Sequence, residues 1–243
     1  MNSKYLCLGA LAIGGVYLYY RLFSETKKKT SNNLQQGIIY LVDGNIDHLF
    51  TLKDLVSPCA GAFDKPFELC KMIGQVPENV HIKIVICTYG GAMTNCEKIL
   101  KKLKSHPAGY TAYIKNECYS AGAVIALGAK EIVMKKDSCL GKIDPQVTGT
   151  NSSYPAIIYD DLPENCIDSH TIAQVRICSQ VLHQMEQLLD IIFGDNIAVR
   201  TKVREQMVYS NFPHSKTFDI AGCKEMGLSI REPNNDELPL FED

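Results

Sequence analysis

The sequence lacks an excess of charge of either sign. Its 25 lysines and arginines face 27 aspartates and glutamates, which gives a formal net charge of −2. Nucleic-acid-binding domains usually carry a strongly basic surface, so we expect no nucleic-acid partner. Hydrophobic residues form 46% and charged residues 21% of the 243 residues, which is typical of an ordered globular chain with one sizeable core.

Closely paired cysteines are missing as well. Ten cysteines are present, but no two have the CxxC spacing that is typical of zinc sites. Disulfide frameworks belong to short secreted chains, whereas Cys87, Cys178 and Cys223 fall inside apolar patterns. We therefore predict reduced, mostly buried thiols in a domain that faces the cytosol, and we expect no metal and no cofactor.

One long apolar run lies near the N-terminus. Residues 5–23 carry a single charge, Arg21, and these nineteen residues would rise about 28 Å as a helix, close to the ~30 Å of a hydrocarbon core. Lysines at 27–29 follow the run, which favours a cytosolic C-terminal domain. The sequence thus predicts a single-pass membrane protein with an anchor and basic linker over residues 1–30. A cleaved signal peptide is the weaker alternative, because no typical cleavage site follows.

The rest of the chain alternates strand and helix patterns. Apolar, β-branched runs predict strands at residues 37–42, 81–87, 112–117 and 131–134. Helical patterns cover residues 66–73, 171–193 and 216–226. A further helical pattern begins after the Gly90-Gly91 turn and ends at residue 103. This alternation predicts an α/β fold with a mostly parallel sheet. We expect the domain to cover residues 31–231 and an acidic, loose tail to cover residues 232–243.

Two turns follow predicted strands at the sheet edge where α/β proteins place their sites. The first contains Gly90 and Gly91, which allow close approach of the backbone to a ligand. The second contains Ser120 at the start of a helix, a position that also suits an N-cap. A carbonyl beside Ser120 could accept N–H bonds from Ala121 and from Gly90 or Gly91. Such an arrangement is an oxyanion hole next to a nucleophile.

These residues belong to a longer series of motifs. In chain order the motifs are Gly90-Gly91, Tyr119-Ser120-Ala121-Gly122-Ala123, Ala126-Leu127, Glu131-Ile132-Val133-Met134, Leu140-Gly141-Lys142-Ile143-Asp144-Pro145-Gln146, His214 and Glu225-Met226-Gly227-Leu228. The series resembles the serine dehydrogenase proteinase family, a branch of the Clp protease and crotonase superfamily that is related to the signal peptide peptidases of the Ser–Lys type. The resemblance covers most of residues 37–230. It implies an oligomeric spiral of repeated β-β-α units, with Ser120 as the nucleophile.

The chain departs from the family pattern at the general base. Clp proteases have a histidine near the position of Asp144, which we expect to orient its neighbours or to cap a turn. Peptidases of the Ser–Lys type use a lysine on a later helix. The best match to that position is Arg176, which stays protonated and cannot accept a proton. A second departure is Tyr89, which replaces a family proline and could narrow the substrate groove.

Four residues could substitute for the missing base. Our first choice is Lys142, in a turn where the family normally has proline; its alternative role is that of a solvated turn lysine. His170 and His183 flank the Arg176 position, although surface histidines of this kind usually have other roles. His214 matches a family histidine in a region that we assign to structure or subunit contact.

The sequence therefore predicts a membrane-anchored serine peptidase, of the endopeptidase type, that forms a homo-oligomer and cleaves peptides or membrane proteins. The long apolar stripe on residues 171–193 supports assembly. A catalytically inactive scaffold of the same fold is the second hypothesis, because a serine without a base does not prove chemistry. An acyl-CoA enzyme of the crotonase type is third, since nothing indicates a CoA-binding patch.

Overall fold

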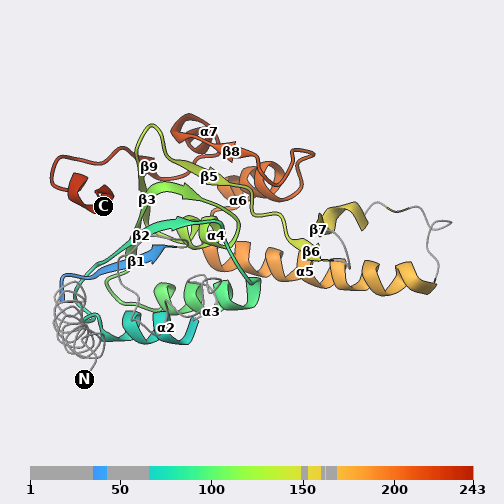
Figure 1. The fold of residues 1–243 in the computed structure, drawn as a ribbon, viewed down its shortest axis with the longest axis horizontal. Coiled ribbons are helices and arrows are strands. Elements are labelled where there is room, and N and C mark those ends of the chain that lie inside the picture. Colours follow the sequence, from blue (N-terminus) through green and yellow to red (C-terminus); the bar gives the residue numbers. More distant parts are fainter. Residues whose placement is uncertain (1–34, 43–65, 149–152, 160–161, 163–168, 243) are drawn as a thin grey trace, which may run out of the picture.

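The structure of the chain is a computed structural model. It describes residues 35–42, 66–148, 153–159, 162 and 169–242. These residues form a mostly parallel sheet with helices packed against it (Figure 1).

The sheet is built from strands that follow each other along the chain. Its main path runs β1–β2–β3–β4–β9, and all neighbours on this path are parallel. The strands are β1 (Ile38–Val42), β2 (Ile82–Thr88), β3 (Tyr110–Cys118), β4 (Glu131–Met134) and β9 (Ile230–Arg231). Apolar and β-branched residues dominate the inner strands because parallel sheets are covered on both faces. The predicted α/β fold with a mostly parallel sheet is confirmed.

Strand β3 also begins a second branch of the sheet. Its last residues pair with β5 (Cys139–Gly141), and β5 pairs antiparallel with β8 (Thr217–Phe218). A separate hairpin of β6 (Gln146–Thr148) and β7 (Ser153–Pro155) follows. The branch brings the segment after β5 to the end of β3, where Ser120 lies.

The helices bury one face of the sheet. Helices α2 (Pro66–Gln75), α3 (Met93–Lys104) and α5 (Ser169–Phe193) lie on the same side in Figure 1. The short helix α4 (Ala121–Leu127) is buried along its whole length and contributes to the main core with these helices. The remaining helices are η2 (Ala156–Tyr159), α6 (Ile197–Val203), the π-helical turn η4 (Arg204–Val208), α7 (Ile220–Glu225) and η5 (Leu238–Phe241).

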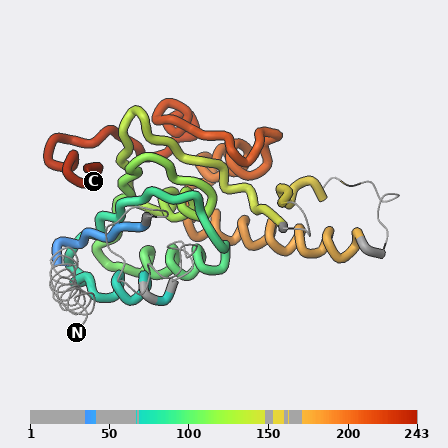
Figure 2. Tube along the Cα trace, in the orientation of Figure 1, coloured from blue at the N-terminus to red at the C-terminus, as the bar shows by residue number. Residues whose placement is uncertain are grey.

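The first part of α5 extends beyond the body of the fold. Figures 1 and 2 show this end of the helix projecting along the longest axis of the molecule, with the β6–β7 hairpin on the same side. The 3-10 helix η2 packs against α5. Three isoleucines of this projection remain exposed: Ile158 at 53%, Ile172 at 42% and Ile177 at 48%.

The second face of the sheet is covered by the C-terminal residues. Leu240 and Phe241 are buried in a small cluster, which they form with Val85, Tyr113 and Val133. The sequence predicted a loose tail from residue 232, and the structure differs. Two apolar side chains among the acidic ones supply enough buried surface to dock the segment.

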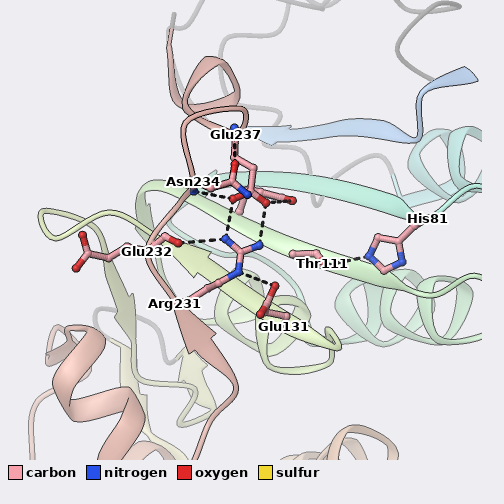
Figure 3. Close-up of polar contacts among 8 residues, drawn as sticks. His81, Thr111, Glu131, Arg231, Glu232, Asn234 and Glu237 are labelled. Atoms are coloured by element: carbon pink, nitrogen blue, oxygen red, sulfur yellow. Dashed lines mark hydrogen bonds and ion pairs between the residues drawn. The ribbon is translucent and has the colours of Figure 1, made fainter.

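An ion-pair network also holds this segment (Figure 3). Arg231 donates to both carboxylate oxygens of Glu237, at 2.6 and 2.8 Å, and to Glu131 Oε2 at 3.0 Å. Glu237 accepts further bonds from the Tyr113 hydroxyl and the Asn234 N–H, each at 2.9 Å. Chiefly through the hydrogen bonds from Arg231, the pKa of Glu237 is lowered to about 2. The ionised carboxylate of Glu237 therefore ties the tail to β9 through Arg231 and to β3 through Tyr113.

Among the described residues, no helix is both long enough and apolar enough to cross a bilayer. The predicted anchor, residues 5–23, and its basic linker lie outside these residues. The predicted localisation, a single-pass membrane protein with a cytosolic C-terminal domain, is therefore corrected, because the described chain supplies no spanning helix to support it.

Candidate active site

Ser120 lies between β3 and α4 in a strained backbone conformation. Its φ of 51° and ψ of −121° make it the one non-glycine residue with positive φ in the described part of the chain. Such conformations cost about 1–3 kcal/mol and concentrate at functional sites. A strained strand-to-helix turn is a known way to expose a serine hydroxyl. The hydroxyl makes no capping bond to α4, so the N-cap role that the position suited is not realised.

Gly90 packs directly against Ser120. It has a φ of 109°, and a Cβ placed on it would come within 2.7 Å of Ser120 Cβ and 3.2 Å of Ala121 N. Only glycine allows this approach. The two turns that the sequence predicted to lie together, one after β2 and one after β3, do lie together.

The backbone donors around Ser120 differ in their availability. The Gly90 N–H is engaged, since it donates to Thr88 Oγ1 at 3.0 Å. For the N–H groups of Gly91 and Ala121, no acceptor exists within the residues that the structure describes. These two groups are thus the predicted donors that remain available to a ligand.

A cavity of about 280 Å³ opens beside Ser120. Its walls come from α3, α4, α5 and the segment after β5. The apolar part of the wall includes Met93, Cys96, Val124, Ile143 and Met185. Its polar side chains are Ser120, Asp144 and Gln146, so polar and apolar groups share the wall of the cavity.

Cys96 is the other conceivable nucleophile of this cavity. It is fully buried, and its thiol donates to the Ala121 carbonyl at 3.3 Å. Burial raises the pKa of the Cys96 thiol well above its ordinary value, which keeps it protonated and unreactive. In the part of the chain that the structure describes, no group of three or more His, Cys, Asp or Glu side chains could hold a metal ion.

Asp144 connects the cavity to His214. Its carboxylate is 1% exposed, and Oδ1 lies 2.7 Å from His214 Nδ1. Oδ2 accepts a hydrogen bond from Gln146 Nε2 at 3.0 Å. His214 is one-third exposed and does not itself line the cavity, to which Asp144 and Gln146 link it. When Nδ1–H donates to Asp144, Nε2 is the nitrogen left to accept a proton.

Lys142, the base predicted first, is held by other groups. Its Nζ donates to the carbonyls of Ser210 and Phe212, both at 2.9 Å, and lies 3.6 Å from Asp144 Oδ2. At 1% exposure the side chain is not a solvated turn lysine. Its carbonyl accepts the Ser120 N–H at 3.2 Å, but Lys142 is not among the residues that line the cavity. Its role as the base stays a prediction.

The other sequence-predicted residues either do not line the cavity or have side chains outside the described part of the chain. Arg176 and His183 are exposed on α5 and do not line the cavity. The side chain of His170 lies outside the described part of the chain. Tyr89, which was expected to narrow the groove, is 74% exposed and stacks on Tyr119 with ring centroids 5.9 Å apart.

Sequence reasoning missed the pairing of Asp144 with His214. The two residues are 70 positions apart, and no local pattern links them. A signal did exist, because both residues stand in the motifs that carried the family resemblance. They were assigned separate structural roles, because an aspartate stands near the position of the Clp histidine and His214 lies in a region assigned to structure or subunit contact.

Comparison with known proteins decides the family. Residues 63–239 match the model of the ClpP-like SDH-type serine proteinases. The chain belongs to this family. The predicted resemblance is thereby confirmed, including its Clp-like, serine-proteinase character.

Two relatives come from Methanocaldococcus jannaschii. The uncharacterized protein MJ1495 is 30% identical over 171 residues, which is 67% of this chain and 56% of that protein. The uncharacterized protein MJ0137 is 26% identical over 170 residues, which is 67% of this chain and 58% of that protein. The chain thus spans little more than half the length of these relatives.

Proposed function

We propose that the chain is a serine peptidase in which Ser120 attacks a peptide carbonyl and His214 accepts the serine proton. The observation that carries the proposal is the position of Asp144. This buried carboxylate lines the cavity of Ser120 and binds His214 Nδ1 at 2.7 Å. Family membership supports the reaction class, and the strained backbone of Ser120 supports its role as the nucleophile.

The three side chains have distinct roles in this mechanism. His214 Nε2 takes the proton from Ser120 Oγ as the bond to the carbonyl carbon forms, and later gives it to the leaving amine. Asp144 holds the imidazole in the required tautomer and stabilises its charged form. The chain order is serine, aspartate, histidine. The triads of α/β-hydrolases have the same chain order, so this order is compatible with the mechanism.

The developing oxyanion would be held by backbone donors. The N–H groups of Gly91 and Ala121 flank Ser120 and have no acceptor among the described residues. Each such donor is typically worth about 10²–10³ in kcat. Gly90 contributes by its lack of a side chain, because its own N–H is bound to Thr88.

The size of the cavity and its apolar side chains support a proposal about the substrate. An apolar cavity of about 150 Å³ holds a benzene molecule. The cavity of about 280 Å³ beside Ser120 therefore has room for one leucine, methionine or phenylalanine side chain. Val124, Ile143 and Met185 would surround it with apolar atoms. We propose that substrates present an apolar residue next to the scissile bond.

Assembly into a homo-oligomer is part of the proposal, as is the family's spiral of repeated β-β-α units. The isoleucines exposed on the α5 projection support assembly, because exposed apolar patches of this kind usually contact another protein surface. Light scattering at micromolar concentration should return a species larger than the monomer. Ile177→Lys should weaken assembly, whereas Ser179→Lys, also exposed on α5, should not. A wild-type chain that stays monomeric would refute the assembly.

Hydrolysis of a peptide library tests the mechanism. Wild type should cut next to apolar residues, and Ser120→Ala should not cut. His214→Ala should lose about 10²–10⁴ in rate, the usual contribution of a general base. His183→Ala is the matched control, since this histidine is exposed away from the cavity, and it should keep wild-type activity. Full activity of His214→Ala would refute the assignment of the base.

A further inference from the structure

We propose that Lys142 is a positioning residue, which fixes the backbone segment that carries His214 and keeps Asp144 paired with a buried positive charge. The inference rests on the proposed function, in which His214 is the base. It differs from the role expected from the sequence, where Lys142 itself accepts the proton. The segment in question, residues 209–216, is called the histidine loop below; it joins η4 to β8.

The histidine loop has little internal support. None of its eight residues is buried, and Phe212 near its middle is 49% exposed. Tyr209, its first residue, is half-buried and packs against the main core, whereas the conformation of the rest depends mainly on hydrogen bonds to its backbone.

Both ends of the loop are bound to the strand segment beside Ser120. Ile143 N–H donates to the carbonyl of Met207, just before the loop, at 3.0 Å. Lys142 N–H donates to the carbonyl of Lys216, the last loop residue, at 3.2 Å. These two bonds fix where the loop leaves and returns. They do not fix its middle.

The side chain of Lys142 binds that middle. Its Nζ donates to the carbonyls of Ser210 and Phe212, both at 2.9 Å. Phe212 stands two positions before His214, so the ammonium holds the backbone that leads directly into the histidine. Other contacts support the loop as well. Tyr209, at its start, packs against the core, and the Arg204 guanidinium lies 4.0 Å from the centre of its ring. Farther along, Ser210 Oγ donates to Gln206 O, and Lys216 N–H donates to the Pro213 carbonyl at 2.9 Å.

The Lys142 ammonium also compensates the charge of Asp144. Both side chains are 1% exposed, and Nζ lies 3.6 Å from Oδ2. A buried carboxylate without a counter-charge is strongly destabilising. Among the described residues, the titratable or charged side chains recorded in contact with Asp144 are Lys142 and His214, while Gln146 is a neutral donor. A neutral Lys142 would leave His214 as the one source of positive charge.

This geometry explains why Lys142 is poorly suited to be the base. To accept a proton, its amine would first have to be neutral, and its lone pair would have to face Ser120. Instead the nitrogen directs its N–H groups to two carbonyls and to the side of Asp144. Lys142 contributes only its main-chain carbonyl to Ser120. It therefore acts on the reaction through His214 and Asp144.

Two substitutions separate the roles. Lys142→Met keeps the length of the side chain but removes the charge and the donors; we expect kcat to fall about 100-fold, the scale of a misplaced catalytic group, with KM nearly unchanged. Lys142→Arg keeps the charge and the donors and cannot act as a base. It should recover at least one-tenth of wild-type kcat. Activity of Lys142→Arg as low as that of Ser120→Ala would overturn the inference in favour of Lys142 as the base. Wild-type kcat in Lys142→Met would overturn it as well.

Nuclear magnetic resonance gives a readout that needs neither substrate nor turnover. The proton that His214 Nδ1 shares with Asp144 should give a downfield resonance in wild type and in Lys142→Arg, and it should broaden or vanish in Lys142→Met. Its persistence in an otherwise folded Lys142→Met would refute the positioning role. If Lys142→Met does not fold, nitrogen-15 spectra of wild type labelled at its lysines provide the test, because they report whether Lys142 Nζ is protonated. We expect Lys142 Nζ to be an ammonium at the pH of assay, and a neutral amine there would refute the inference.

Failure of the proposed function gives a different result. In that case Ser120→Ala and His214→Ala would keep the activity of wild type, whatever the Lys142 variants do. The resonance of His214 would still report whether Lys142 holds the histidine loop.

Discussion

Replacing Ser120 by glycine should stabilise the protein while abolishing its activity. Ser120 is held at φ 51° and ψ −121°, a conformation that residues other than glycine avoid. Glycine removes the Cβ and therefore the strain. Since the serine hydroxyl makes no capping bond to α4, little is lost in exchange.

The expected gain follows from two opposing terms. Relief of the backbone strain contributes about 1–3 kcal/mol. Glycine also increases the freedom of the unfolded chain, which costs about 0.4–1 kcal/mol. The net gain should be about 1 kcal/mol, or about 2–4 °C in Tm for a domain of this size. Ser120→Ala keeps the Cβ and the strain, so its stability should stay within about 0.5 kcal/mol of wild type.

Urea unfolding of the three proteins, at one fixed protein concentration, measures these differences. An N-cap role for Ser120, which its position in the sequence also suits, would instead give a loss of about 1 kcal/mol in Ser120→Ala. If Ser120→Gly proves no more stable than Ser120→Ala, the strain argument is wrong, and with it one support for Ser120 as the nucleophile.

Two further predictions concern the network around Glu237 and the turn at Gly90. The pKa of Glu237 lies at about 2, below its ordinary value of 4.5, so its contribution is present above pH 4.5 and is lost as the pH falls towards 2. Glu237→Gln should therefore lose up to about 3 kcal/mol of unfolding free energy at pH 7, and less at pH 3, by urea titration; equal stability at pH 7 would contradict the network. Gly90→Ala should destabilise the chain and abolish hydrolysis, because its Cβ would lie 2.7 Å from Ser120 Cβ at φ 109°. Its control is Gly74→Ala in α2, where the new Cβ meets nothing closer than 3.6 Å; an active Gly90→Ala variant would contradict the turn geometry.

The central sheet and the meeting of the two turns were predictable from the sequence. The β-branched runs mark strands that are covered on both faces, and their carboxyl ends lie at one edge of a parallel sheet. Gly90 and Ser120 follow neighbouring strands, so their contact follows from topology and from a glycine where a side chain would collide. These inferences use only local patterns and one rule of sheet geometry.

Contacts between distant segments were not predictable in the same way. Asp144 meets His214, and Lys142 reaches Ser210 and Phe212, because β8 returns beside β5. No periodic pattern in the sequence predicts that β8 pairs with β5. The tail was predicted to be loose because its composition is acidic. That prediction gave no weight to Leu240 and Phe241, two apolar residues that pack on β2, β3 and β4.

The most direct test of the account is covalent labelling of the active site. Wild-type protein should react with a fluorophosphonate, and peptide mapping by mass spectrometry should find the adduct on Ser120 Oγ. Labelling should be absent in Ser120→Ala and slowed about 10²–10⁴-fold in His214→Ala, while His183→Ala labels like wild type. Folded wild-type protein that takes up no label, or an adduct on another residue, would contradict the assignment of Ser120 as the nucleophile.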